Sequence, residues 1–128
     1  MTNSNYIIMA KFNSSDKLIF VNINKSFEAM NSNDTSSPYY RENLKECTVK
    51  FWAVKEEKAS AATHILGCYQ GKVIEVVKIS KVRSASPDEY PGRKVFEGSE
   101  ERESPYIGLD LHEVFDSLRN FRTKYWNL

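Results

Sequence analysis

Residues 51–98 read FWAVKEEKASAATHILGCYQGKVIEVVKISKVRSASPDEYPGRKVFEG, and this stretch decides the fold. Residues 64–69 and 72–83 are rich in β-branched and other apolar side chains, which predicts two strands. Gln70 and Gly71 stand between them, and glycine supplies the backbone conformation that a tight hairpin turn needs. Neither face of the second strand is wholly polar, so we expect it to be covered in part on both faces.

The residues before this hairpin predict one further strand and two helices. Residues 48–54 alternate between two faces, so Phe51 and Trp52 would point to opposite sides of a strand. Residues 55–62 contain helix formers and small side chains, which favours a short helix packed against the sheet. Residues 38–47 have apolar side chains at helical spacing after a proline, which favours a short amphipathic helix.

The N-terminal part predicts another hairpin. Residues 6–12 and 17–24 are apolar runs, and the Asn- and Ser-rich residues 13–16 between them are typical of a turn. Residues 31–37 consist almost entirely of Asn, Ser, Asp and Thr, which predicts a loop or a poorly ordered excursion.

The C-terminal part predicts short elements separated by loops. Residues 84–92 have the composition of a loop, and residues 95–96 and 106–111 are expected to be short strands. Asp110 is placed to cap a final helix that would span Leu111 to Leu118. The aromatic pair at 125–126 closes the chain.

Length and composition indicate one domain, residues 1–128, and the strands and helices predicted along it make its class α+β. The chain has 128 residues, of which 41% are hydrophobic, enough for one core and too few for two. No apolar run is long enough to span a membrane and no secretory signal is present, so we expect no membrane partner and a cytoplasmic location. Cys47 and Cys68 are then expected to be free thiols.

The formal net charge is +1, so the whole molecule has no long-range field that would attract it to phosphate. The charges are nonetheless patterned: basic residues prevail from Lys72 to Lys94, and acidic residues prevail from Glu97 to Asp110. This arrangement would give one basic face and one acidic rim, or else ordinary solvated strand edges and loops.

The sequence contains no catalytic or metal-binding signature. His64 and Cys68 are four residues apart, which suits one zinc ion on a helix but not on the predicted strand, so no metal and no cofactor are expected. His64 and His112 are residue types for an acid–base pair, but no pattern indicates that they converge. A glycine-rich phosphate loop is also missing, and we therefore expect a binding module rather than an enzyme.

The most specific pattern is a resemblance that covers the chain from Leu44 onward. Trp52-Ala53-Val54, the run from Ile65 to Val76, Arg93 to Gly98 and Tyr106-Ile107-Gly108 together resemble a recurrent bacterial and phage domain of the PUA-like superfamily, which includes the EVE, ASCH and YTH domains. The resemblance implies a small β-barrel with mixed or antiparallel strands, flanked by short helices. It also implies a pocket that accepts a nucleobase, often a modified one.

The resemblance implies the residues of that pocket as well. Its aromatic cage transfers to Trp52, Tyr69 and Phe96, with Arg93 as polar partner and Tyr106 from the later motif. Aromatic faces stack on any nucleobase, and arginine stacks on a base or bonds to its edge. Basic side chains of the long strand are expected to position the nucleic-acid backbone: Lys78, Lys81 and Arg83.

Two functions lead the hypotheses, and an enzyme such as a nuclease that uses His64 or His112 is the third. The first is a non-enzymatic module that recognises a nucleobase, unmodified or modified, in DNA or RNA. The second is a protein-interaction or inhibitor protein of a phage or mobile element, acting in counter-defence. Its acidic segment, Glu97 to Glu103, would mimic phosphate or dock onto a basic protein partner. The oligomeric state is not specified by the sequence. Under either hypothesis we expect the alternating strand positions to form the core: Val49, Phe51, Ile65, Val73, Val77 and Ile79.

Overall fold

A computed structural model describes residues 12–128 and has an α+β architecture, as predicted. One mixed five-stranded sheet has the order β4-β3-β2-β1-β5. In chain order the elements are β1 (Leu18–Asn22), α2 (Asn24–Asn31), α3 (Leu44–Val49), α4 (Glu56–Ala61), β2 (His64–Tyr69), β3 (Lys72–Ser84), β4 (Lys94–Glu100), the 3-10 helix η1 (Leu111–Glu113) and β5 (Thr123–Trp126).

Strand β1 lies inside the sheet, parallel to β2 and antiparallel to β5. Its residues Leu18 to Val21 are fully buried, because both faces of the sheet are covered. The strand predicted over 17–24 is confirmed. Of its predicted hairpin partner, residues 6–11 lie outside the described residues.

The hairpin of β2 and β3 confirms the prediction from residues 64–83. Gln70 and Gly71 both have positive φ, 49° and 80°, as a two-residue type I′ turn requires. Strand β3 then continues to pair with β4, and each of its two ladders contains an irregularity, at Gly67/Cys68 and at Ile79/Lys81. These irregularities change which side chains of β3 face each side of the sheet.

The sheet is open within residues 12–128, since β4 and β5 are its two edges and do not pair with each other. The coarse α+β prediction is therefore confirmed, whereas the predicted small β-barrel is not, because the described strands form one open sheet.

The strand predicted over residues 48–54 is wrong. Residues 44–49 form helix α3, which begins where the Asn43 side chain accepts a hydrogen bond from Glu46 N at 2.8 Å. This cap fixes the start of the helix one turn before the alternating residues, so helical packing overrides their strand pattern. After α3 only an isolated bridge, Trp52 to Lys94, joins this segment to the sheet. The helix predicted over residues 38–47 instead lies at residues 44–49.

Three further sequence expectations need correction. Helix α2 was not predicted, although residues 32–37 after it form hydrogen-bonded turns, in agreement with the predicted loop. Residues 106–111 are turns with one isolated bridge, not a strand. The final helix is reduced to η1, although Asp110 does cap it, accepting a hydrogen bond from His112 N.

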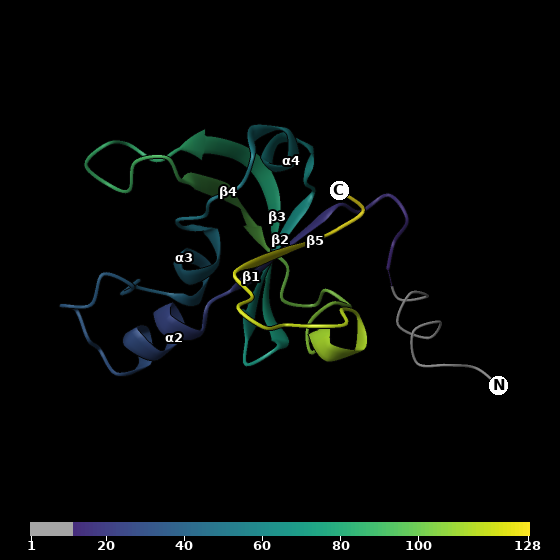
Figure 1. The fold of residues 1–128 in the computed structure, drawn as a ribbon, viewed down its shortest axis with the longest axis horizontal. Coiled ribbons are helices and arrows are strands. Elements are labelled where there is room, and N and C mark those ends of the chain that lie inside the picture. The colour runs from purple at the N-terminus through teal and green to yellow at the C-terminus, as the bar shows by residue number, and fades with distance from the viewer. Residues whose placement is uncertain (1–11) are drawn as a thin grey trace.

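Two apolar cores lie on opposite faces of the sheet. One contains Phe20 and Leu66 and is closed by the segment from Tyr106 to Phe121; the other contains Ile65 and Val77 and is closed by the three helices. Figure 1 shows α2 and α3 on one side of the strands and the segment around η1 on the other. Within residues 12–128 no helix has the length and apolar character needed to cross a bilayer.

Most of the predicted core is confirmed. Val49, Ile65, Val73 and Val77 are buried, whereas Phe51 and Ile79 stay partly exposed. Phe51 follows the end of α3 instead of lying on a central strand, which explains its exposure.

Candidate functional site

The structure does not bring the five predicted pocket residues to one site. Trp52, Tyr69 and Phe96 belong to the core under the helices, whereas Tyr106 belongs to the core on the opposite face. Phe96 is only 1% exposed and cannot present a ring face to a ligand. Arg93 lies with its guanidinium over the ring of Tyr90, at 4.7 Å.

The other cage members are held by contacts within the protein. Trp52 Nε1 donates to the carbonyl oxygen of Thr48 at 2.7 Å. The ring of Tyr69 lies 4.6 Å from that of Phe27, and its hydroxyl donates to Glu28 Oε2 at 3.1 Å. These two aromatic residues therefore fasten α3 and α2 to the sheet.

Of the predicted backbone-binding residues, Lys78 and Lys81 are exposed on β3. Arg83 is engaged by Glu89, with nitrogen–oxygen distances of 2.8 and 3.2 Å. Solvent weakens an ion pair at the surface, so a phosphate is able to compete for the arginine.

Two adjoining hollows lie beside α3, and they share Asn43 and Lys45 in their walls. The first, the carboxyl pocket, has a volume of about 550 Å³ and is lined by Asn43, Leu44, Lys45, Ile74, Glu75, Glu100, Arg102 and Ile107. The second, the α3–β4 groove, has a volume of about 620 Å³. Its charged lining consists of Lys45, Glu46, Lys50, Arg83 and Glu97.

An aromatic and cationic stack stands beside the residues of the α3–β4 groove. The rings of Phe51 and Tyr90 are stacked, with centroids 6.0 Å apart and planes at 30°. Arg41 lies over Phe51 at 4.9 Å and Lys50 at 5.9 Å, while Arg93 covers Tyr90. Segments far apart in the chain thus build one surface. We call Arg41, Lys50, Phe51, Tyr90 and Arg93 the cation–aromatic stack.

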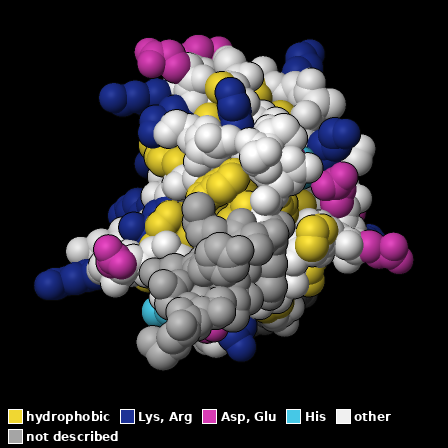
Figure 2. Space-filling view, turned by 90° about the vertical axis from the view of Figure 1, so that its right-hand side faces the viewer, with side chains coloured by type: hydrophobic (Ala, Val, Ile, Leu, Met, Phe, Trp, Pro, Cys, Tyr) yellow, Lys and Arg dark blue, Asp and Glu magenta, His cyan; other side chains and the backbone are white. Residues whose placement is uncertain are grey.

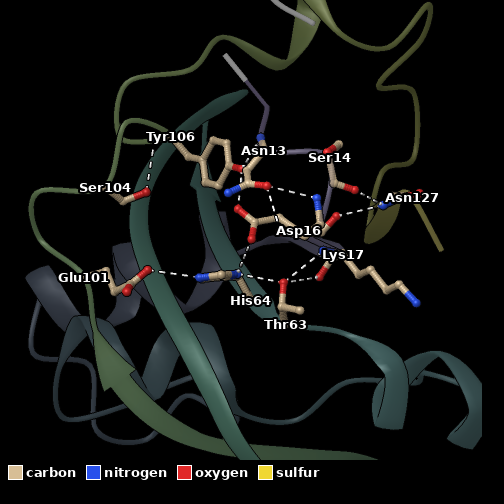
Figure 3. Close-up of polar contacts among 11 residues, drawn as sticks. Asn13, Ser14, Asp16, Lys17, Thr63, His64, Glu101, Ser104, Tyr106 and Asn127 are labelled. Carbon is tan, nitrogen blue, oxygen red and sulfur yellow. Dashed lines mark hydrogen bonds and ion pairs between the residues drawn. The ribbon is translucent and has the colours of Figure 1, made fainter. Parts of the chain in front are cut away.

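A second polar cluster, shown in Figure 3, joins the start of β1 and β2 to the end of β4. His64 Nε2 lies 3.0 Å from Glu101 Oε1, and its Nδ1 lies 2.8 Å from Thr63 Oγ1. Tyr106 donates its hydroxyl to Asp16 Oδ2 at 2.5 Å and accepts from Asn13 N at 3.1 Å. Each of these groups is bonded inside the protein, so the cluster fastens the loops around the sheet.

The two histidines do not form an acid–base pair. His64 begins β2, whereas His112 lies beside Gly71, beyond the other end of that strand. A strand of this length separates them by roughly 20 Å. Among residues 12–128, no three potential metal ligands of the types His, Cys, Asp and Glu come together.

Figure 2 shows the face of the molecule that is turned to the right in Figure 1. Lys and Arg side chains and Asp and Glu side chains are both distributed around its rim, with hydrophobic side chains between them. The described part of this face therefore offers no surface of one charge sign. The hollows and the cation–aromatic stack around α3 are the better candidate for a functional site.

Sequence reasoning missed most of this site. The sequence predicts Phe51 as a core residue and places Tyr90 in the loop over residues 84–92, and the partnership between α3 and β4 depends on the tertiary fold. The one available signal was Glu75, a carboxyl among apolar residues of a strand that is covered on both faces. No protein-family model matches the chain, and neither the curated proteins nor the solved structures gave a match.

Proposed function

We propose that this chain is a non-enzymatic module that binds single-stranded nucleic acid along the α3–β4 groove and stacks a nucleobase on the cation–aromatic stack. The observation that carries the proposal is the alternation of cations and aromatic rings beside a groove with three basic side chains. Proteins that bind single strands combine these two features, a cationic track and stacking rings.

Relative magnitudes favour opening of the stack by a base. An exposed arginine over an aromatic ring contributes about 0.5–1 kcal/mol. Base stacking on an aromatic ring contributes about 1–3 kcal/mol. A base is therefore able to displace Arg93 from Tyr90, and the released guanidinium is then free to pair with a phosphate.

The charges near the groove set the expected salt dependence. Its basic residues are Lys45, Lys50 and Arg83, and contacts to three phosphates would give a slope of log affinity against log salt of roughly −2 for a single strand. Glu46 and Glu97 lie in the same groove and reduce the attraction. We therefore expect binding at low salt that is lost readily as salt rises.

The protein-interaction hypothesis ranks second because part of the acidic segment is engaged internally. Glu101 contacts His64, and Glu100 lies beside Glu75 and Arg102. Membership in the PUA-like superfamily and a cytoplasmic location stay predictions from the sequence.

Fluorescence anisotropy with labelled DNA and RNA oligonucleotides at low salt tests the proposal. Tyr90→Ala is the informative variant and Tyr39→Ala its matched control, since both rings are 45% exposed and each lies under a cation. We expect Tyr90→Ala to weaken binding by about 5- to 150-fold, the equivalent of about 1–3 kcal/mol, and Tyr39→Ala to leave it unchanged.

Two results would contradict the proposal: no saturable binding by the wild-type protein, or equal losses in the two tyrosine variants. In the first case, a pull-down from nuclease-treated lysate that recovers a basic protein would favour the interaction hypothesis.

A further inference from the structure

Glu75 is an unusual carboxyl because it is only 2% exposed. It lies on β3 opposite Gly67, and Thr48 of α3 lies close above that glycine. Its Oε1 accepts a hydrogen bond from Val76 N at 3.0 Å. Its Oε2 is buried, and no hydrogen-bond donor among residues 12–128 reaches it. A buried acceptor without a donor is costly, so the ionised Glu75 requires a donor at Oε2, whereas the protonated carboxyl shares its proton with Glu100.

The neighbouring group is a second carboxyl. Glu100 ends β4, where it pairs with Val77 of β3, and both carboxyls line the carboxyl pocket. Burial, followed by the proximity of Glu100, raises the pKa of Glu75 to about 7. A proton shared with Glu75 and the charge of Arg102 lower the pKa of Glu100. The free pocket thus holds one proton between two acceptors below neutral pH and none above it.

The remaining lining gives the pocket two unlike ends. Leu44, Ile74 and Ile107 provide apolar walls beside the carboxyls. Arg102, whose side chain is 82% exposed, and the half-buried Lys45 supply positive charge. These two cations and Glu100 are the charged groups that face Glu75 from the elements around the pocket. The arrangement suits a ligand that is planar, carries hydrogen-bond donors on one edge and has an anionic group at its other end.

We propose that the carboxyl pocket receives a guanine base of the bound strand, with its adjacent N1–H and N2–H groups donating to the carboxyl oxygens of Glu75 and Glu100. The inference rests on the function proposed above. Adenine, cytosine and uracil present a mixture of donors and acceptors on this edge, so an acceptor would face a carboxylate. A guanidinium group of a partner protein fits less well, because Lys45 and Arg102 repel it and attract the phosphate of a nucleotide.

The test compares a thymidine oligonucleotide containing one central guanosine with the same oligonucleotide containing inosine, which lacks the N2 amino group. Anisotropy at pH 8 should show about tenfold weaker binding of the inosine strand by the wild-type protein, the loss of one hydrogen bond to a charged group. Glu75→Gln should abolish the preference for guanosine. Glu103→Gln, an exposed change in the same acidic segment but outside the pocket lining, should retain it.

A second readout is the pH dependence. Because guanine needs acceptors, it displaces the proton shared by the two carboxyls, and the affinity for the guanosine strand should rise up to tenfold between pH 6 and pH 8. Glu75→Gln should flatten this rise. The circular dichroism spectrum of Glu75→Gln, compared with that of the wild type, shows whether the variant is folded.

The outcomes separate the two proposals. Failure of every oligonucleotide to bind the wild-type protein overturns the proposed function itself. Equal binding of guanosine and inosine strands, or a preference that survives in folded Glu75→Gln, overturns the guanine pocket and leaves the stacking function standing.

Discussion

Replacement of Glu75 by glutamine is expected to stabilise the protein at pH 8 but not at pH 5. In the folded protein burial raises the pKa of Glu75 to about 7, compared with 4.5 for an ordinary glutamate. The folded state therefore binds the proton more tightly than the unfolded state does. As pH rises from 4.5 to 7 the unfolded state gains stability from ionisation while the folded state does not, so the wild-type protein becomes progressively less stable.

The magnitude follows from the size of this difference. One pKa unit corresponds to 1.36 kcal/mol, so the ionised Glu75 costs the folded protein up to about 3 kcal/mol above pH 7. Glu100 offsets part of this cost, because the shared proton moves its pKa in the opposite direction. Glutamine has nearly the same volume and no charge, so the cost disappears in the variant.

Urea denaturation of the wild type, Glu75→Gln and Glu103→Gln at pH 5, 6, 7 and 8 measures the effect. The stability difference between Glu75→Gln and the wild type should grow by about 2–3 kcal/mol from pH 5 to pH 8, whereas the exposed control should show no such trend. A difference that is the same at every pH would refute the reasoning, since it would mean that Glu75 titrates alike in the folded and unfolded states.

Three further changes test other parts of the fold. Gly67→Ala should cost about 1–3 kcal/mol of unfolding free energy in urea, because its Cβ would clash with Thr48 Oγ1. Adding Thr48→Ala should restore part of the loss, and additive losses would contradict the steric explanation. Tyr106→Phe should lower the melting temperature, because it removes the hydroxyl bonded to Asp16 and Asn13 and with it about 1–3 kcal/mol of unfolding free energy. An unchanged melting temperature would show that the polar cluster does not hold these loops in place. Cys47 and Cys68 are buried, and burial raises the pKa of both thiols, that of Cys47 to about 11. Neither thiol should therefore react with a disulfide reagent until urea unfolds the protein. Rapid reaction of the native protein would count against this packing.

Local pattern was sufficient for the elements whose stability depends on near neighbours. The β2–β3 hairpin agrees with its prediction because Gln70 and Gly71 supply the turn and the flanking residues are apolar on both faces. The short helix α4 lies within residues 55–62 for a similar reason, since its residues are strong helix formers and its small Ala59 packs into the core.

Where local signals compete, the prediction from sequence was wrong. Residues 48–54 alternate like a strand, but the cap at Asn43 begins a helix that includes Val49, and the helix buries Cys47, Thr48 and Val49 against the sheet. The energy of that packing outweighs the strand preference of a few residues. Phe51 consequently leaves the core and joins Tyr90.

The candidate site itself was decided by tertiary structure. The apolar setting of Glu75 in its strand was visible in the sequence, but its pairing with Glu100 depends on the β3–β4 register, which shifts between Ile79 and Lys81. Phe96 and Tyr106 were expected to share a pocket, yet they lie in cores on opposite faces of one sheet. Periodicity along a strand indicates which residues share a face, whereas strand order, register and the elements that cover each face come from contacts between distant segments, and these contacts decide which side chains meet.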